Sequence, residues 1–411
     1  MLIYQFKLNN DISKKDTSIL NKYSDDIPDI SVARIVPYQS TKAPKSYLNM
    51  QNVIYSSYKT NTIIKSKRYI PTVPERILDA PDVTNNYYLK LIDWSSKNIL
   101  SVALRGEVYL WNAHTGDIDS LVQLEDNNII TSISFASGGG FLAVGTNDGV
   151  IQLWDINKKI KLRSLKSSHE RISCSDWNNH VITAGSRTGS ISNHDVRVSP
   201  SLISKIQEHK LEVCGLKWNP SGKYLASGAN DNTVLIWDQA KMTSKSSNSS
   251  NSGNPQPLTK FTQHRAAIKA IAWCPWESNT IATGGGTADR KLRIWDSQNG
   301  SHLYKVDTES QISSVLWSTE YRELITSHGH PNNELIIWKY PSLQKTIDLI
   351  GHQARILDMS MSPEGTTVVS LSADETLRFW ECFQVDEKRK KSKNQNVFQD
   401  REGRLPSLQL R

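Results

Sequence analysis

The amino-acid sequence predicts an all-β fold, a seven-bladed WD-repeat β-propeller, because one short strand pattern recurs seven times. Six copies end in tryptophan and one ends in histidine, and the steps between equivalent positions are 43, 40, 43, 58, 43 and 42 residues. A repeat of about 40–45 residues that ends in Trp-Asp is typical of a four-stranded propeller blade. The equivalent positions are Trp111, Trp154, His194, Trp237, Trp295, Trp338 and Trp380. A rigid disc of this kind favours binding of other proteins over catalysis.

The first repeat contains all four strands of a blade. Its apolar runs are separated by Gly, Asn, Asp and Ser turns and cover Leu89–Trp94, Ile99–Leu104, Val108–Trp111 and Ile118–Leu124. The long step of 58 residues has a visible cause, because residues 241–257 are rich in Ser, Asn, Gly and Pro. This composition predicts a flexible loop between two strands.

The last repeat lacks a fourth strand, since a charged tail follows Phe383. An open propeller would expose a strand edge. We therefore expect residues 75–79, Glu-Arg-Ile-Leu-Asp, to pair with the seventh blade and close the ring. The propeller then spans residues 71–383, between a disordered, partner-binding arm (1–70) and a basic tail (384–411).

The net charge of +8 lies in the two ends of the chain. Residues 1–70 carry a net charge of +6 and residues 384–411 one of +4, which leaves the propeller near −2. A nucleic-acid groove needs clustered positive charge on the folded domain, so no nucleic-acid partner is expected. The basic run at 388–393 is either a nuclear-localisation patch or a solvated end.

Membrane insertion and secretion are not expected either. No apolar run approaches the roughly 18 residues of a membrane-spanning helix, and the first ten residues contain no signal-peptide core. The four cysteines are scattered without a Cys-x-x-Cys pair, which indicates buried thiols in a reduced, intracellular protein.

Histidine and aspartate recur at fixed places in the repeats, and two explanations compete. Either they form a catalytic or metal site, or they belong to a buried chain of hydrogen bonds that runs from aspartate through histidine and a strand Ser or Thr to the repeat tryptophan. The propeller favours the second. His328 and His330 resemble metal ligands, but no Cys or carboxylate cluster supports them. We expect no metal, no cofactor and no enzymatic activity. The residues concerned are His209, His264, His352, Asp148, Asp231, Asp289 and Asp374.

Several segments are more specific than a general WD repeat. They include Pro74-Glu-Arg-Ile-Leu-Asp-Ala-Pro81, Asn86-Tyr-Tyr-Leu-Lys-Leu-Ile-Asp-Trp-Ser95, Ala272-Trp-Cys-Pro-Trp276 and Ile337-Trp-Lys-Tyr-Pro341. From about Lys67 to Phe383 the chain resembles the Fizzy family, the cell-division-cycle coactivators of the anaphase-promoting complex. It looks closest to the mitotic branch, which the spindle checkpoint inhibits. The resemblance implies a protein that brings substrates to this ubiquitin ligase through two short degrons, the destruction box (Arg-x-x-Leu) and the Lys-Glu-Asn box.

The resemblance implies that the destruction box binds at the rim, between the first and last blades. The matching residues are Leu78, Asp79 and Trp111. The chemistry fits, because Asp79 can pair with the degron arginine while Leu78 and Trp111 line an apolar slot for its leucine. The competing explanation is that Asp79 caps a turn and Trp111 belongs to the repeat core.

The resemblance implies a second site, for the Lys-Glu-Asn box, on the face of the disc. Its residues are Tyr87, Asn230, Thr287, Gln311 and Arg355. Three of them precede first strands and two lie between second and third strands, and both types of loop open on the same face of a propeller. Residues far apart in sequence should therefore meet around one channel, where Arg355 can reach the degron glutamate.

The chain departs from the family pattern in its ends. Residues 1–70 lack the C-box used to activate the ligase, and the docking tail ends Leu410-Arg411 where Ile-Arg is usual. Asn86 stands where an acidic residue is common. Either an upstream segment is missing or ligase activation is reduced.

The sequence leaves three functions open: a coactivator, a degron-binding decoy or inhibitor, and a WD-repeat scaffold of an RNA or chromatin complex. The first implies ligase subunits, degron-bearing cyclins and securin, and spindle-checkpoint proteins as partners, in nucleus and cytoplasm.

Overall fold

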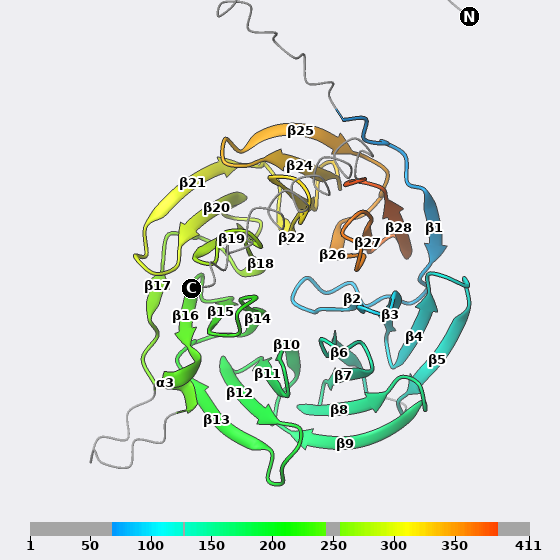
Figure 1. Ribbon diagram of the computed structural model, residues 1–411, viewed down its shortest axis with the longest axis vertical. Helices are drawn as coiled ribbons and strands as arrows, with labels where there is room; N and C mark the ends of the chain where they lie inside the picture. The colour runs from blue at the N-terminus through cyan, green and yellow to red at the C-terminus, as the bar shows by residue number, and fades with distance from the viewer. Residues whose placement is uncertain (1–67, 126–127, 244–254, 385–411) are drawn as a thin grey trace, which may run out of the picture. The chain divides into compact units, whose positions relative to one another are not determined.

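Seven four-stranded antiparallel sheets form a closed ring around a central axis in the computed structural model (Figure 1), which confirms the predicted seven-bladed propeller. The structure describes residues 68–125, 128–243 and 255–384. The predicted arm, except its last residues, and the predicted tail with Leu410 and Arg411 lie outside the described residues.

The strands follow one another around the ring in chain order. Blade one consists of β2 (Ile92–Trp94), β3 (Ile99–Leu104), β4 (Glu107–Asn112) and β5 (Ile118–Gln123), and blade two of β6 (Ile130–Phe135), β7 (Phe141–Thr146), β8 (Val150–Asp155) and β9 (Ile160–Lys166). Blade three consists of β10 (Ile172–Asn178), β11 (Val181–Ser186), β12 (Ser190–Asp195) and β13 (Leu202–Gln207), and blade four of β14 (Val213–Trp218), β15 (Tyr224–Ala229), β16 (Val234–Asp238) and β17 (Thr259–Phe261).

The last three blades repeat this order. Blade five consists of β18 (Ile268–Trp273), β19 (Thr280–Gly285), β20 (Lys291–Asp296) and β21 (His302–Asp307), and blade six of β22 (Ile312–Trp317), β23 (Glu323–His328), β24 (Leu335–Lys339) and β25 (Gln344–Leu349). Blade seven consists of β26 (Ile356–Met361), β27 (Val368–Ser372), β28 (Thr376–Trp380) and β1 (Arg76–Asp79).

Strand β1 closes the ring, as the sequence predicts. It pairs antiparallel with β28, with Leu78 opposite Leu377 and Asp79 opposite Thr376. Backbone hydrogen bonds extend the pairing at both ends, from Glu75 N to Phe379 O (2.8 Å) and from Ala80 N to Glu375 O (2.7 Å). Blade seven is thereby built from both ends of the propeller sequence, with β1 as its outermost strand.

The first strand of blade one is shorter than expected. The sequence predicts a strand over Leu89–Trp94, whereas β2 begins at Ile92. The preceding residues turn instead: the amide of Tyr88 donates to Asn86 Oδ1 (3.0 Å), and Lys90 makes an isolated bridge to Ser132 of blade two. The segment between β1 and β2 thereby reaches into the centre of the ring (Figure 1).

The start of the loop predicted at 241–257 differs from the prediction. Residues Gln239–Thr243 form a short helix, α3, and residues 244–254 lie outside the described residues. Within the described part of the chain, no helix is long and apolar enough to cross a membrane.

The predicted chain of hydrogen bonds is present in blades four, five and seven. In blade four the Trp237 indole N–H donates to Ser227 Oγ (2.9 Å), whose hydroxyl lies 2.8 Å from His209 Nε2. His209 Nδ1 lies 3.0 Å from the Asp231 carboxylate. Since an indole only donates, the serine hydroxyl donates to Nε2 and the histidine donates from Nδ1. Equivalent chains join Trp295, Thr283, His264 and Asp289, and Trp380, Ser370, His352 and Asp374.

Blade six has the same motif, but its histidine is the last residue of β23 and does not precede the first strand of the blade. The Trp338 indole donates to Thr326 Oγ1 (2.7 Å), which contacts His328 Nε2 (2.7 Å), and His328 Nδ1 lies 3.1 Å from Ser310 Oγ. The metal-like histidine of the sequence is thus a buried structural residue. Burial lowers the pKa of its imidazole to about 3, which keeps it neutral.

Blades one, two and three lack the hydroxyl that accepts from the tryptophan. The residues at the position equivalent to Ser227 are Val102, Val144 and Ala184. In blade two Asp148 accepts from Thr146 instead of a histidine. In blade three the tryptophan is also absent, and His194 occupies its place next to Ser201 Oγ (3.1 Å). His194 therefore replaces the tryptophan in a blade that also lacks the accepting hydroxyl.

We expect Ser227→Ala to lower the free energy of unfolding by about 1–3 kcal/mol, because it leaves the buried Trp237 indole N–H without an acceptor. Urea unfolding followed by tryptophan fluorescence measures the change. Ser227→Thr is the matched control, since threonine occupies the equivalent position in blades five and six. Equal losses for the two variants would contradict this account of the motif.

We expect His194 to make the protein less stable in mild acid. Burial lowers the pKa of its imidazole from 6.5 to about 4, so between these values the unfolded chain binds a proton that the folded chain does not. The free energy of unfolding should fall as pH falls through this window, by on the order of 1–2 kcal/mol at pH 5 from this residue. Urea unfolding of the protein and of His194→Phe from pH 7 to 4.5 measures it. The pH slope should be shallower in the variant, and identical slopes would refute the assignment.

Candidate functional site

The face site, defined as Tyr87, Asn230, Thr287, Gln311 and Arg355, is organised around the buried side chain of Tyr87. This residue lies in the segment that reaches into the centre of the ring, and only 6% of its surface is exposed. Its hydroxyl donates to Ile312 O (2.9 Å), and its ring packs with Cys214 and Ala267. Burial raises the pKa of the phenol well above its ordinary value, so the hydroxyl stays a donor.

Each contact of Tyr87 leads to another residue of the face site. Ile312 follows Gln311 directly, and Ala267 O accepts from Gly286 N (2.9 Å), next to Thr287. Glu212 O, two residues before Cys214, accepts from Asn230 N (2.8 Å). Arg355 is joined to Asn85, two residues before Tyr87. The structure therefore brings all five sequence-predicted residues together on one face of the ring, around its centre.

Gln311 and Arg355 lie on either side of Gly329. A Cβ added to it would lie 3.4 Å from Gln311 Oε1 and 3.5 Å from the Cβ of Arg355. Gln311 and Arg355 thus flank a position without a side chain. Both are half-buried, whereas Thr287 is exposed.

A buried ion pair borders the site on the side of blades three and four. Arg171 donates from Nε and Nη2 to the two carboxylate oxygens of Glu212, at 2.8 and 2.7 Å, and Ser173 Oγ also donates to Glu212 (2.6 Å). A guanidinium paired through two bonds to one carboxylate is held firmly and its charge is neutralised. This pair was not identified from the sequence.

Two buried charged side chains, Lys269 and Asp358, lie deeper in the ring than the face site. The Lys269 ammonium lies 6.0 Å from the Tyr87 ring centroid and donates to Leu357 O (2.6 Å), so it spans from blade five to blade seven. Burial lowers the pKa of Lys269, and it raises the pKa of Asp358. The pairing register shifts at Lys269 in blade five and at Leu357 in blade seven, which marks a β-bulge near the start of each first strand.

The rim site, defined as Leu78, Asp79 and Trp111, lies at the junction of blades seven and one. Leu78 is half-buried against the cluster that contains Trp111, and Asp79 is exposed. Because side chains alternate along a strand, these two leave β1 on opposite faces. A ligand that contacts both must lie along the outer edge of β1.

The side chain of Trp111 is more buried than a binding slot would require, with 6% of its surface exposed. Its ring packs against Phe379 of blade seven, with centroids 4.8 Å apart, and the Arg76 guanidinium lies 5.3 Å from its centroid. The apolar surface between Leu78 and Trp111 is therefore covered by Arg76. Arg76 was not among the residues expected from the sequence, although its position two before Leu78 puts both on one face of β1.

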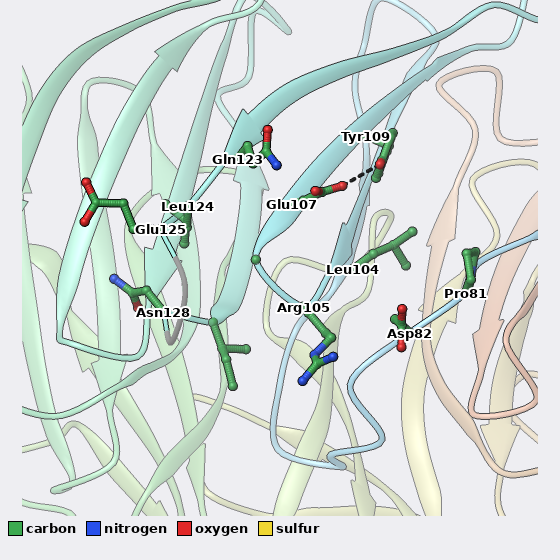
Figure 2. Close-up of a pocket in the computed structure, with 12 residues that line it drawn as sticks. Pro81, Asp82, Leu104, Arg105, Glu107, Tyr109, Gln123, Leu124, Glu125 and Asn128 are labelled. Atoms are coloured by element: carbon green, nitrogen blue, oxygen red, sulfur yellow. Dashed lines mark hydrogen bonds between the residues drawn. The ribbon is translucent and has the colours of Figure 1, made fainter.

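A pocket of about 580 Å³ lies beside the end of β1 (Figure 2). It is lined by Pro81 and Asp82, by the turn between β3 and β4, and by the end of β5. Its charged residues are Asp82, Glu107 and Glu125, with Arg105 as the one cation of the lining. Figure 2 shows Glu107 accepting from the Tyr109 hydroxyl. The acidic balance of this pocket, next to Asp79, suits a cationic ligand group.

Metal binding finds no support in the described residues. No group of three or more His, Cys, Asp or Glu in this part of the chain is placed to hold a metal ion. The four cysteines are buried and form no disulfide, and burial raises the pKa of the Cys214 thiol, which disfavours the reactive thiolate.

Comparisons with known proteins give one family. The CDC20/Fizzy WD40 domain matches residues 78–380. "Anaphase-promoting complex subunit cdc20" of Dictyostelium discoideum is 47% identical over 83% of this chain and 66% of its own length. "Cell division cycle 20.1, cofactor of APC complex" of Arabidopsis thaliana is 44% identical over 87% of this chain and 78% of its own.

A solved structure is also similar to this chain in sequence and in fold. A chain of the "Crystal Structure of Mitotic Checkpoint Complex" is 37% identical and superposes with a TM-score of 0.73, over 86% of this chain and 98% of that one. The names of these proteins are compatible with the mitotic branch expected from the sequence. The chain matches just under two thirds of the length of its Dictyostelium relative. On its sequence, its fold and the extent of the match, the chain belongs to the CDC20/Fizzy family.

Proposed function

We propose that the protein is a substrate-recognition coactivator of the anaphase-promoting complex, a ubiquitin ligase. Relatives that are 44–47% identical over the matched residues are named as a subunit or a cofactor of that complex. Such a protein acts by binding, so the proposal includes no enzymatic activity. Its partners would be ligase subunits, cyclins, securin and spindle-checkpoint proteins, in nucleus and cytoplasm.

The observation that carries this proposal is the convergence of the face site on Tyr87. Four loops from blades four to seven meet there, and they offer an amide, a hydroxyl, a second amide and a guanidinium. A Lys-Glu-Asn segment needs a cation for its glutamate and neutral polar partners for its amide and ammonium groups. The set fits that tripeptide, with Arg355 as the partner of the glutamate.

The rim site suits a destruction box. A peptide along the outer edge of β1 can bond to the free backbone of that strand while its side chains contact both faces. Asp79 and the acidic pocket beside it favour the degron arginine. A leucine can reach Leu78 and Trp111 once Arg76 moves from the ring, a movement that an exposed side chain on an edge strand permits.

The two sites would act together. A short degron makes few contacts and binds weakly alone, whereas two degrons on one flexible substrate raise the effective concentration of the second. Both sites depend on residues 76–88, which join blade seven to blade one. Their spacing is therefore fixed by the fold.

We expect Asp79→Asn and Arg355→Ala to separate the two binding activities. Loss of one charge-assisted contact costs about 2 kcal/mol, or roughly thirtyfold in Kd. Asp79→Asn should weaken a labelled destruction-box peptide and leave a Lys-Glu-Asn peptide unchanged, and Arg355→Ala should do the reverse. Fluorescence anisotropy at constant salt measures both. If the unmodified protein binds neither peptide, the proposal fails.

A ligase assay separates the coactivator from a degron-binding decoy. We expect the protein to stimulate ubiquitination of a cyclin fragment when added to anaphase-promoting complex depleted of coactivator. Asp79→Asn and Arg355→Ala combined should abolish the stimulation without changing the melting temperature. Inhibition of a ligase that already holds its coactivator would instead identify a decoy.

A further inference from the structure

The contact between Asn85 and Arg355 joins residues 270 positions apart, at the centre of the face site. Arg355 Nε donates to Asn85 Oδ1 (2.8 Å), and Arg355 Nη2 donates to the backbone oxygen of Asn85 (3.1 Å). One residue thus accepts from the guanidinium through both its side chain and its backbone. The contact was not anticipated from the sequence.

The two donors belong to one edge of the guanidinium. Nε and Nη2 point to the same side of the planar group, so Asn85 takes the side edge and leaves the outer edge, formed by Nη1 and the second hydrogen of Nη2. Two parallel N–H groups on that outer edge match the two oxygens of a carboxylate. A guanidinium held by its side edge has lost most of its rotational freedom before a ligand arrives.

Asn85 is itself held in place by its neighbours. The amide of Asn86 donates to Thr84 O (2.7 Å), and Asn86 Oδ1 accepts from Tyr88 N (3.0 Å), which forms a tight local turn. Tyr87 anchors that turn through its buried hydroxyl. Asn85 therefore presents its oxygens from a fixed backbone, although its side chain is exposed.

The neutrality of Asn85 is as important as its position. An aspartate there would accept the same two bonds but would pair its charge with Arg355, as Glu212 does with Arg171. In the described part of the chain, no carboxylate forms an ion pair with Arg355. The amide thus orients the guanidinium and leaves its positive charge for a ligand.

We propose that Asn85 is a positioning residue of the face site, which aims Arg355 at a peptide carboxylate and gives the site its preference for a glutamate over a glutamine. The inference rests on the proposed function, because it takes the ligand to be a degron whose glutamate meets Arg355. It adds a residue outside the family-matched set, and it assigns the selectivity of the site to an uncharged acceptor.

Peptide titrations of the full chain test the proposal. Two labelled peptides that differ only in Lys-Glu-Asn against Lys-Gln-Asn are titrated into the protein, Asn85→Ala and Asn85→Asp. We expect Asn85→Ala to weaken the glutamate peptide roughly tenfold and to leave the glutamine peptide within about twofold. Asn85→Asp should abolish the preference for glutamate. Asn147→Asp, an equal charge change in the exposed turn between β7 and β8, is the matched control and should keep it.

A second measurement needs no peptide. The ¹⁵Nε–Hε signal of Arg355, assigned by its loss in Arg355→Lys, should exchange slowly with water in the protein and quickly in Asn85→Ala, because the Nε–H has lost its acceptor. Unchanged exchange, or an unchanged glutamate preference in both Asn85 variants, overturns the proposal. If exchange changes as expected but the unmodified protein binds no Lys-Glu-Asn peptide, the proposed function fails and Asn85 remains only a structural partner of Arg355.

Discussion

The pairing of β1 with β28 is the interaction on which the rest of the structure depends. It completes blade seven with residues that precede blade one, and so converts a linear array of sheets into a ring. The same connection produces both candidate sites. Leu78 and Asp79 lie on β1 itself, and the chain then crosses to the centre, where Tyr87 is fixed by contacts to blades four, five and six. A substitution that loosened β1 would therefore disturb the rim and the face together, whereas one within a later blade would disturb its own loops.

The hydrogen-bond chains of the repeats have a local consequence for the face site. Blades four to seven contain the tryptophan–hydroxyl–histidine motif, and the same four blades supply Asn230, Thr287, Gln311 and Arg355. Asn230 adjoins Asp231 and Gln311 adjoins Ser310, both members of these chains. The buried chains thus fix the backbone of the loops that carry the proposed ligand-binding groups, which would lower the conformational entropy lost on binding. Blades one to three lack the motif, and none of them supplies one of these four residues.

Much of the fold and of the face site was predictable because both depend on periodicity. The spacing of the tryptophans gave the number of blades, and the missing fourth strand of the last repeat identified residues 75–79 as its partner. The five residues of the face site came from the resemblance to the family, and the rule that two types of loop open on one face predicted that they would lie close together. What was not predictable depends on side-chain direction. Neither the burial of Tyr87, nor Arg76 over Trp111, nor the contact of Asn85 with Arg355 has a sequence period, since each depends on the path of one irregular segment.

The distribution of charge on the face explains where an anionic group would bind. Arg171 and Arg355 each directly precede the first strand of a blade, and their guanidinium groups differ in their partners. Arg171 is neutralised by Glu212 in a bidentate ion pair, so a second carboxylate there would meet the charge of the first. Arg355 is held by the neutral oxygens of Asn85 and keeps its charge. Under the proposed function, an incoming carboxylate would therefore bind on the side of blade seven, and the amides of blades four and six would be left for the neutral and cationic groups of the same peptide. The proposed selectivity would then arise because one guanidinium is paired with a carboxylate and the other with an amide.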